Sequence, residues 1–551
     1  MLTTPLLKTK TMQVILKIFL LTALLTACSG EPSTTTTSDV VKPTPTEASR
    51  ILTQASFGAT TTEINRLSNM GTAAWFNDQF AKPQPLHFAY MNAVQNNLPA
   101  GQKLTEEHFF ESFWQRAITG DDQLRQRVAF ALSEIFVISF QNNTLANNPR
   151  GVAHYYDTLE AYAFGNFRTL LEQVTLHPMM GNYLSSLRNQ KTVGARLPDE
   201  NYAREVMQLF TIGLKQLNQD GTEVIPAAAT YTSDDIKGLA KVFTGWSWAG
   251  SDKSQNRFFG GTPDPNRDYL PMQNYPNFHE PLPKSFLGTT ISANTTGEES
   301  LKIALDTLFN HPNVGPFIGR QLIQRLVMSN PSPAYVGRVA AAFNNNGLGV
   351  RGDLKAVIKA VMLDTEALTA SSSNTTGKLR EPIIRLANWM RAFHATSAST
   401  RFQLGNTDDP LRELGQTQMR SPTVFNFFRP GYVPPNTSIS AANLLAPEMQ
   451  ITEETSVVGY LNFMRNAIPN GTGLRVNNVN DIRPDYTTEL ALVATPDKLV
   501  DHLNLILMQN TMSPTLRGQI LGAINVNNTA INKVYLAIFL IMASPEYLVQ
   551  K

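Results

Sequence analysis

The sequence predicts an all-α protein with long irregular loops, and three observations carry that prediction. Apolar residues recur at helical spacing in many segments, with capping residues before them and Gly or Pro after them. The apolar–polar alternation that is typical of strands is scarce. The 551 residues, 42% of them hydrophobic, are enough to build a large core.

The first 27 residues resemble a bacterial signal peptide. Lys17 precedes the apolar run 18–25, and small residues precede Cys28. The stretch LTAC (25–28) resembles a lipobox, in which the cysteine is lipidated after cleavage. We therefore expect a cell-envelope protein anchored to the membrane through Cys28, and Ser29 in place of an aspartate favours the outer membrane where an organism has two. An ordinary signal peptide with an incidental cysteine is the alternative interpretation.

The mature chain is predicted to begin with a tether. Residues 28–49 are rich in Ser, Thr and Pro, so the helical domain is expected at 50–551. Because Cys28 is the one cysteine, a disulfide within the chain is impossible and a cysteine-rich metal site is excluded. Removing the three lysines of the first 27 residues takes the formal charge from +2 to −1. A nearly neutral chain without a dense Lys/Arg stripe is not expected to bind nucleic acid.

The predicted helices follow one another along the chain. The first is capped by Thr60 and ends at Gly71, and the last contains the apolar run 534–543, which is too short to cross a membrane. The segments with helical spacing are 60–71, 121–139, 198–213, 232–243, 351–364, 381–393, 495–508 and 532–548. Two irregular stretches, about 246–298 and 398–446, have the length of functional loops or linkers.

A faint internal repeat divides the helices into two related units. HPMMGNYL starts at His177 and HPNVGPFI at His311, and DIKGLAK (235–241) parallels DLKAVIK (353–359). In both copies Pro fits the first helical position, so the histidine ring would cap the helix or face a cleft. Chance similarity between amphipathic helices is the alternative. The predicted units and the loop that joins them are about 50–245, 299–551 and 246–298.

Several blocks, in order, resemble the bacterial domain-of-unknown-function family 1800 over roughly residues 50–551. The blocks are HPMMGNYL, ENYAREVMQLFTIG, DIKGLAKVFTGWSW, FHEPLPKSFLG, HPNVGPFIGRQLIQRLV, LGQTQMRSPTVFNFFRPGY and ASPEYLVQ. The resemblance implies a large, exported, mostly helical protein without an agreed activity, with an exported partner from a neighbouring gene that resembles sulfatases and phosphatases. Gln208 stands where a second glutamate is usual, and Glu280 where aspartate is usual. The first departure weakens any mechanism that needs paired carboxylates on this helix.

The stretch PDENYAREVMQLFTIG (198–213) predicts a helix with a carboxylate at the margin of its apolar stripe. At about 100° per residue, Glu205 lies only about 60° from Tyr202. A carboxylate there must be paired, because an unpaired buried charge costs several kcal/mol. Two interpretations follow: a structural ion pair with Arg320 or Arg127, or a cleft acid or base whose pKa is raised.

An enzymatic interpretation would draw on this helix and on the long loop. The predicted catalytic residues are Glu205, His177 and His279, with Glu200, Arg204 and Lys284 as further candidates. The predicted substrate-binding residues are Trp246, Trp248, Arg320 and Asn201. The two tryptophans have the shape to stack on sugar rings, with core packing as the alternative. Because no His-Glu-x-x-His and no close His pair occurs in the sequence, no metal ligands are predicted, and any cofactor stays open.

The segment FNFFRPGY (425–432) sets aromatic residues around Arg429 and predicts a cation–π cluster. This cluster would line a groove or fasten the loop, and we favour fastening. The chain contains no Gly-x-Ser-x-Gly, phosphate loop or Rossmann fingerprint. Serine hydrolases, kinases and dehydrogenases are therefore disfavoured.

Two functions remain open. The first is a lipid-anchored envelope protein that acts by binding or assembly at the bacterial surface. The second is an envelope hydrolase or lyase that acts on a polysaccharide or similar polymer by acid–base chemistry. The second requires Glu205, His177 and His279 to converge on one open pocket within about 10 Å.

Overall fold

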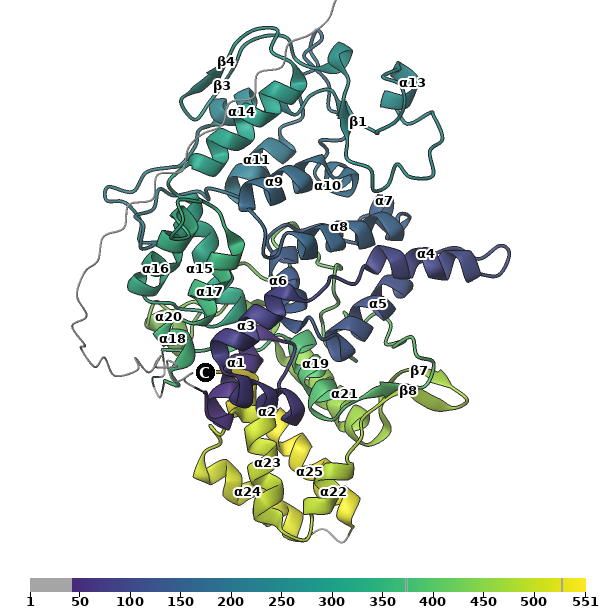
Figure 1. Cartoon of the computed structure of the whole chain (residues 1–551), viewed down its shortest axis with the longest axis vertical. Coiled ribbons are helices and arrows are strands. Elements are labelled where there is room, and N and C mark those ends of the chain that lie inside the picture. Colours follow the sequence, from purple (N-terminus) through teal and green to yellow (C-terminus); the bar gives the residue numbers. More distant parts are fainter. Residues whose placement is uncertain (1–41, 372, 374, 527–528) are drawn as a thin grey trace, which may run out of the picture. The chain divides into compact units, whose positions relative to one another are not determined.

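The computed structural model describes residues 42–371, 373, 375–526 and 529–551. Helices dominate this part of the chain, which confirms the predicted fold class, and the short strands form small antiparallel sheets (Figure 1). By their contacts, residues 42–551 form one unit. None of the described helices has the length and apolar character that crossing a bilayer requires. The predicted signal peptide, Cys28 and most of the predicted tether lie outside the described residues.

The folded unit begins earlier than position 50. Helix α1 (Pro45–Ala55) starts inside the segment predicted as a tether, and Ala48 and Ser49 are buried. Thr44 and Glu47 form a capping box in front of this helix, and Pro45 occupies its first position. The last residues of the Ser/Thr/Pro-rich segment therefore form the start of a helix. The tether ends before position 49.

The helices of the first half are α2 (Thr61–Met70), α3 (Thr72–Ala81), α4 (His87–Asn97), α5 (Glu106–Thr119), α6 (Gln123–Ser133), α7 (Asn143–Ala146), α8 (Pro149–Ala161), α9 (Phe167–Leu176), α10 (Pro178–Tyr183), α11 (Asn201–Gln208), α12 (Ser233–Val242) and α13 (Gln255–Phe258). Those of the second half are α14 (Gly297–Asn310), α15 (Val314–Leu326), α16 (Pro333–Asn344), α17 (Leu354–Met362), α18 (Thr365–Leu368), α19 (Pro382–Ala392), α20 (Ser438–Ala441), α21 (Glu454–Asn470), α22 (Thr487–Leu492), α23 (Pro496–Met508), α24 (Pro514–Asn525), α25 (Ala530–Ala543) and α26 (Pro545–Leu548).

Two helices, α6 and α19, are buried along their whole length, including their charged residues. Arg391 of α19 donates to the carbonyl oxygens of Gly58 (2.9 Å) and Ile118 (2.8 Å), so its guanidinium satisfies loop and helix-end acceptors in the core. The predicted helix 121–139 is shorter than expected. It ends at Ser133, where a tight turn leads into buried irregular backbone from Ile135 onward.

The segment 246–298 is ordered by two short strand pairs and by contact with α12. Besides α13, its elements are β1 (Trp246–Ser247), β2 (Gln273–Asn274), η1 (Pro276–Phe278), β3 (Lys284–Phe286) and β4 (Thr289–Ile291), in the pairs β1–β2 and β3–β4. Helix α12 packs so closely on β3 that a Cβ on Gly238 would lie 1.7 Å from the carbonyl oxygen of Ser285. Glycine is therefore required at this contact.

The remaining strands fasten the C-terminal helices. They are β5 (Lys378–Leu379), β6 (Thr396–Ser397), β7 (Thr472–Val476), β8 (Val479–Arg483) and β9 (Val549–Gln550), in the orders β5–β9 and β6–β8–β7, and η2 (Pro447–Ile451) precedes α21. The apolar run 534–543 lies in α25, whose inner face is buried, as predicted for a core helix. Pro545 interrupts the predicted helix 532–548 and starts α26.

The two His-Pro segments of the internal repeat have similar local structures. The Nδ1 atoms of His177 and His311 each accept the backbone N–H two residues on, both at 3.2 Å. His177 thereby caps α10, one of its two predicted roles, whereas His311 makes the contact in the turn before α15, whose N-cap is Asn313. Pro178 opens α10 as predicted. Pro312 lies in the turn before α15, so the helical position predicted for it is wrong, because that helix begins only at Val314. The relationship between the two units stays a prediction.

Candidate functional site

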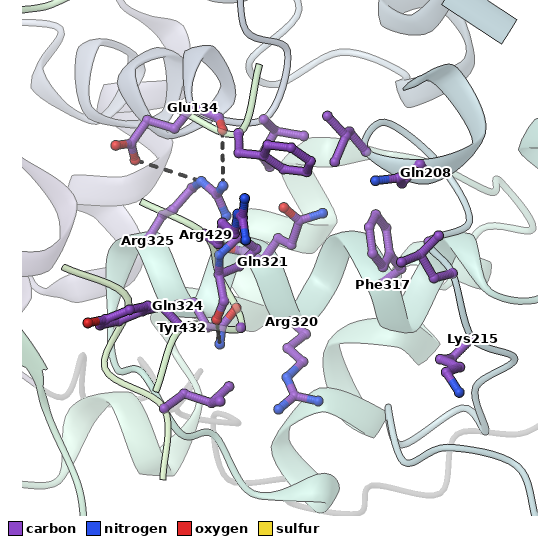
Figure 2. A pocket seen from close by; sticks show the side chains of 18 of the residues that line it. Glu134, Gln208, Lys215, Phe317, Arg320, Gln321, Gln324, Arg325, Arg429 and Tyr432 are labelled. Carbon is purple, nitrogen blue, oxygen red and sulfur yellow. Dashed lines mark hydrogen bonds and ion pairs between the residues drawn. The ribbon is translucent and has the colours of Figure 1, made fainter. Parts of the chain in front are cut away.

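A cavity of about 660 Å³ opens between the end of α11, the loop 213–217, helix α15 and the segment 424–433 (Figure 2). Ligand sites usually measure about 300–1,000 Å³, so this cavity has the size of one. Its wall is mostly apolar. The apolar side chains that line it are Ile135, Leu209, Leu214, Leu217, Phe317, Val424, Phe425, Pro430, Val433 and Leu445.

One asparagine holds two walls of the cavity together. Asn313, at the start of α15, donates from Nδ2 to the carbonyl oxygens of Ile212 (2.9 Å) and Lys215 (2.7 Å), and its Oδ1 accepts the N–H of Leu217 (3.0 Å). Gly213 turns the chain here with a φ of 70°, and a Cβ at this position would collide with the Phe317 ring. The loop after α11 is therefore held against α15.

Four cationic side chains line the cavity: Lys215, Arg320, Arg325 and Arg429. Within the described residues, Arg320 and Lys215 make no side-chain hydrogen bond or ion pair. Burial lowers the pKa of Arg320, and the charge of Glu223 acts in the opposite direction. Arg429 stacks on the Phe425 ring at 4.8 Å, which confirms the predicted cation–π contact. Both residues line the cavity, which matches the groove-lining role and not only the favoured role of fastening the loop.

The inner end of the cavity is polar and buried. Arg325 donates to the carbonyl oxygen of Glu134 (3.0 Å), and its Nε lies 3.7 Å from the Glu134 carboxylate. Figure 2 shows Arg325 reaching towards Glu134 at one end of the cavity, and Arg320 and Lys215 extending at the other. The amide nitrogen of Gln321, a residue 6% exposed, has no hydrogen-bond partner in the part of the chain that the structure describes.

Behind this inner end lies a buried charge network of Arg127, Glu134, Arg325, Lys378, Glu381 and Glu448. Burial and the charge of Glu381 raise the pKa of Glu134 well above its ordinary range, against the effect of Arg325. Although burial raises it, the pKa of Glu381 is lowered overall by Lys378 and by the hydrogen bond with Glu134. Burial also raises the pKa of Glu448, against the charge of Lys378. The network therefore sets three cations against three acids, two of which have pKa values raised by burial.

Glu205 lies close to this cavity in sequence but does not line it. The residue is 8% exposed, and its Oε2 atom has no hydrogen-bond partner among the described residues. Among the described residues, Glu205 does not form the predicted ion pair with Arg320 or Arg127. Burial raises the pKa of Glu205, and the Arg204 charge lowers it. Gln208, one turn further along α11, does line the cavity, and its Oε1 accepts a hydrogen bond from Tyr231 (3.2 Å).

The other predicted residues of α11 lie at its start and on its outer face. Glu200 precedes the helix and pairs with Arg204 at 3.6 Å, with both side chains well exposed. Asn201 is exposed at the first helical position. An exposed pair of this kind contributes at most about 1 kcal/mol.

His177 is buried and forms a pair with another histidine. Its Nε2 lies 3.0 Å from Nδ1 of His154, and its Nδ1 accepts the N–H of Met179. Nε2 of His177 therefore carries the proton and donates to His154. Burial, with the charge of His154, lowers the pKa of His177 well below its ordinary value. His177 does not line the large cavity.

His279 and Lys284 lie in the segment 246–298, also away from the large cavity. Nδ1 of His279 donates to the carbonyl oxygen of Thr244 (2.9 Å), and Nε2 has no partner among the described residues. Lys284 is fully buried, and burial lowers its pKa. Glu280 accepts the N–H groups of Thr192 and Leu282, which hold its pKa below the usual value despite burial.

The two tryptophans of the predicted sugar platform differ in exposure. Trp246 pairs with Asn274 between β1 and β2 and is 5% exposed, so its ring is covered by protein. Trp248 is half-buried, with Arg267 over its ring at 5.0 Å. Of the two, only Trp248 keeps exposed ring surface.

One cluster has residue types that suit a metal ion. His87, Asp157 and Glu160 are buried, with potential ligand atoms within 4.8 Å of one another. Each of these groups already has partners, however. The His87 ring contacts Ser112 (2.8 Å) and Glu160 (2.9 Å), and Asp157 accepts two backbone N–H groups. The cluster is better explained as a hydrogen-bonded core element.

The sequence missed most residues of the cavity. Glu134, Lys215 and the α15 residues Gln321 and Arg325 come from three separate segments, and none of these four residues was singled out as a candidate. Arg320 and the aromatic segment at 425–432 are the parts that the sequence singled out. The signal that the sequence offered for the cavity was Arg320, an arginine that stands beside apolar residues of its helix.

Fold and site define a mostly helical protein with a ligand-sized, positively charged cavity. Its family is shown by a family model, described as protein of unknown function (DUF1800), which matches residues 50–549. The chain belongs to this family, as its sequence blocks predict. Neither a curated protein nor a solved structure matches the chain.

Proposed function

We propose that this protein is a lipid-anchored cell-envelope protein that binds a ligand at the bacterial surface through the cavity between α11, α15 and the segment 424–433. The observation that carries the proposal is the cavity itself, about 660 Å³ in volume, with an apolar wall and side chains that have no partners within the described residues. Such a surface costs free energy while it is left empty and hydrated. The signal-peptide-like start with Cys28 supports the envelope location.

The cavity is tested by filling it. A neutral naphthylamine fluorophore is titrated into the full chain in phosphatidylcholine nanodiscs, with empty nanodiscs as the blank. Val433→Trp inserts a large ring at the cavity wall, and Val458→Trp places the same ring on α21, where the valine is 55% exposed. Binding that is lost only in Val433→Trp supports the proposal. Equal binding by both variants, or no binding by the wild type, refutes it.

The anchor is tested separately. Replacement of Cys28 by alanine should abolish incorporation of labelled palmitate and move the protein out of the membrane fraction, because the predicted attachment atom is gone. Unchanged labelling would refute lipidation at Cys28. Assembly with an exported protein from a neighbouring gene is a further form of this proposal, and co-purification of that protein with the wild type, and not with Val433→Trp, would support it.

One observation favours the second function, an envelope hydrolase or lyase acting on a polysaccharide. Glu205 has a buried oxygen without a partner among the described residues and a raised pKa, as a general acid needs. His177 and His279 have buried rings in separate surroundings, which gives this function less support than ligand binding. In a polysaccharide-degradation screen, an activity that Glu205→Gln abolishes would establish it. An activity that persists in the variant would remove Glu205 from the mechanism.

A further inference from the structure

Three cationic groups at the cavity differ from the arginines that are paired with acids elsewhere in the molecule. Arg338 contacts Asp364 and Glu366, and Arg517 contacts two aspartates. Within the described residues, Arg320 and Lys215 contact no carboxylate, and Arg429 contacts only an aromatic ring through its side chain. These cations are therefore available to an anion that enters the cavity.

The donors on α15 form two adjacent rows. Arg320 and Gln324 are four residues apart, as are Gln321 and Arg325, so each pair follows one face of the helix. Phe317 lies one turn before Gln321 and continues this row with an apolar ring (Figure 2). One helix thus presents charge, a hydrogen-bond donor and an aromatic surface to the same space.

The unpartnered amide of Gln321 is a second, independent sign of a ligand. This side chain is more than nine-tenths buried and lines the cavity, and its nitrogen has no acceptor among the described residues. A buried donor without a partner costs about 1–3 kcal/mol, so a water or a polar ligand group that enters the cavity is favoured as its acceptor. The acid of the wall, Glu134, lies 3.7 Å from Nε of Arg325, so the charge of this arginine offsets its repulsion of an anion.

Resting on the proposed binding function, we propose that the ligand is a single-chain amphiphilic anion. Its carboxylate or phosphate head pairs with Arg320 and Lys215, and its chain lies against Phe317, Leu217 and Val433. At roughly 30 Å³ for each water, the cavity has room for about twenty waters, which suits a dodecyl chain with its head group. A cationic or purely apolar ligand would leave the cations desolvated and unpaired.

The test compares probes that share one chain and differ in charge. Laurate, dodecyl phosphate, dodecanol and dodecyltrimethylammonium are titrated into the full chain in phosphatidylcholine nanodiscs. We expect the two anions to bind at least about tenfold more tightly than dodecanol, the value of one charge-assisted hydrogen bond, and the cation to bind most weakly. Laurate and dodecyl phosphate distinguish a free fatty-acid head from a lipid phosphate.

Arg320→Gln keeps a polar, though shorter, side chain and removes its charge. It should weaken laurate binding by about tenfold and leave dodecanol binding unchanged. The matched control is Arg465→Gln, an exposed arginine on α21, which should change neither. Laurate and dodecanol binding equally in wild type and Arg320→Gln would overturn the amphiphilic-anion proposal and leave the cavity as a binding site. Failure of every probe, including the neutral fluorophore, would overturn both proposals.

Discussion

The buried cluster of His87, Asp157 and Glu160 makes the stability of the protein depend on pH in a direction that can be calculated. Nε2 of His87 lies 2.9 Å from Oε1 of Glu160, and both side chains are fully buried. Burial, with the charge of Asp122, raises the pKa of Glu160 to about 8, and burial lowers the pKa of His87 to about 3. Glu160 is therefore a neutral acid that can donate to a neutral imidazole.

The folded state then keeps a proton that the unfolded state releases. Because the pKa of Glu160 is raised from 4.5 to about 8, its contribution to stability is complete below about pH 4.5 and is lost as the pH rises towards 8. At about 1.4 kcal/mol for each pH unit, this loss amounts to about 5 kcal/mol. Glu160→Gln mimics the protonated acid: its amide can donate to His87 and accept from Gln84, as the acid does.

Urea unfolding followed by tryptophan fluorescence at about pH 5 and about pH 9 measures this difference. The variant and the wild type should have similar stability at the lower pH, and the variant should be more stable by up to about 5 kcal/mol at the higher pH. Glu172→Gln, which alters an exposed partner of Arg168, should change little at either pH. A variant equally destabilised at both values would mean that Glu160 is ionised against a protonated His87, and would refute the reasoning.

Three further outcomes follow from packing and hydrogen bonding. Gly238→Ala should lower stability by about 3 kcal/mol or more, because its Cβ would overlap the Ser285 carbonyl oxygen. The control Gly522→Ala, in α24 with open space around it, should raise stability by about 1 kcal/mol. Equal effects of the two variants in chemical unfolding would contradict this reasoning. Arg391→Met should lower the free energy of unfolding by about 3 kcal/mol, because it leaves the carbonyl groups of Gly58 and Ile118 unpaired. Arg465→Met, on the surface, should change it by no more than about 0.5 kcal/mol. Similar values for the two variants would be inconsistent with the buried role of Arg391. Added zinc should not raise the melting temperature, since the donors of the His87 cluster already have partners; a rise that His87→Gln abolishes would show a metal site there instead.

Local signals in the sequence were sufficient to locate many helices. Thr60 and Gly71 bound α2, and Thr232 starts α12, because capping and chain reversal depend on a few neighbouring residues. The capping ring of His177 was predictable for the same reason. The start of α1 also has a local signal, its capping box, but it lies in a segment whose Ser/Thr/Pro-rich composition predicts a tether.

The candidate site was predictable only in fragments. Arg320 and the aromatic segment around Arg429 stand out in the sequence, but nothing local shows that they share a cavity with Glu134 and Lys215. Helix α6 illustrates the reason. Its polar residues Arg125, Gln126 and Arg127 would be expected to face solvent, but all three are buried. Which helix covers that face depends on long-range packing.

The sequence by itself determined that this is a mostly helical member of its family, with helix starts and stops set by caps, glycines and prolines, since these interactions close within a few residues. Only the tertiary structure decided which charges lose their water and which stay available. Arg391 finds carbonyl partners in the core, burial beside Glu381 raises the pKa of Glu134, and Arg320 lines the cavity with no acid in contact among the described residues. Burial and charge pairing join residues far apart in the chain, and their energies depend on distances that only the folded molecule establishes.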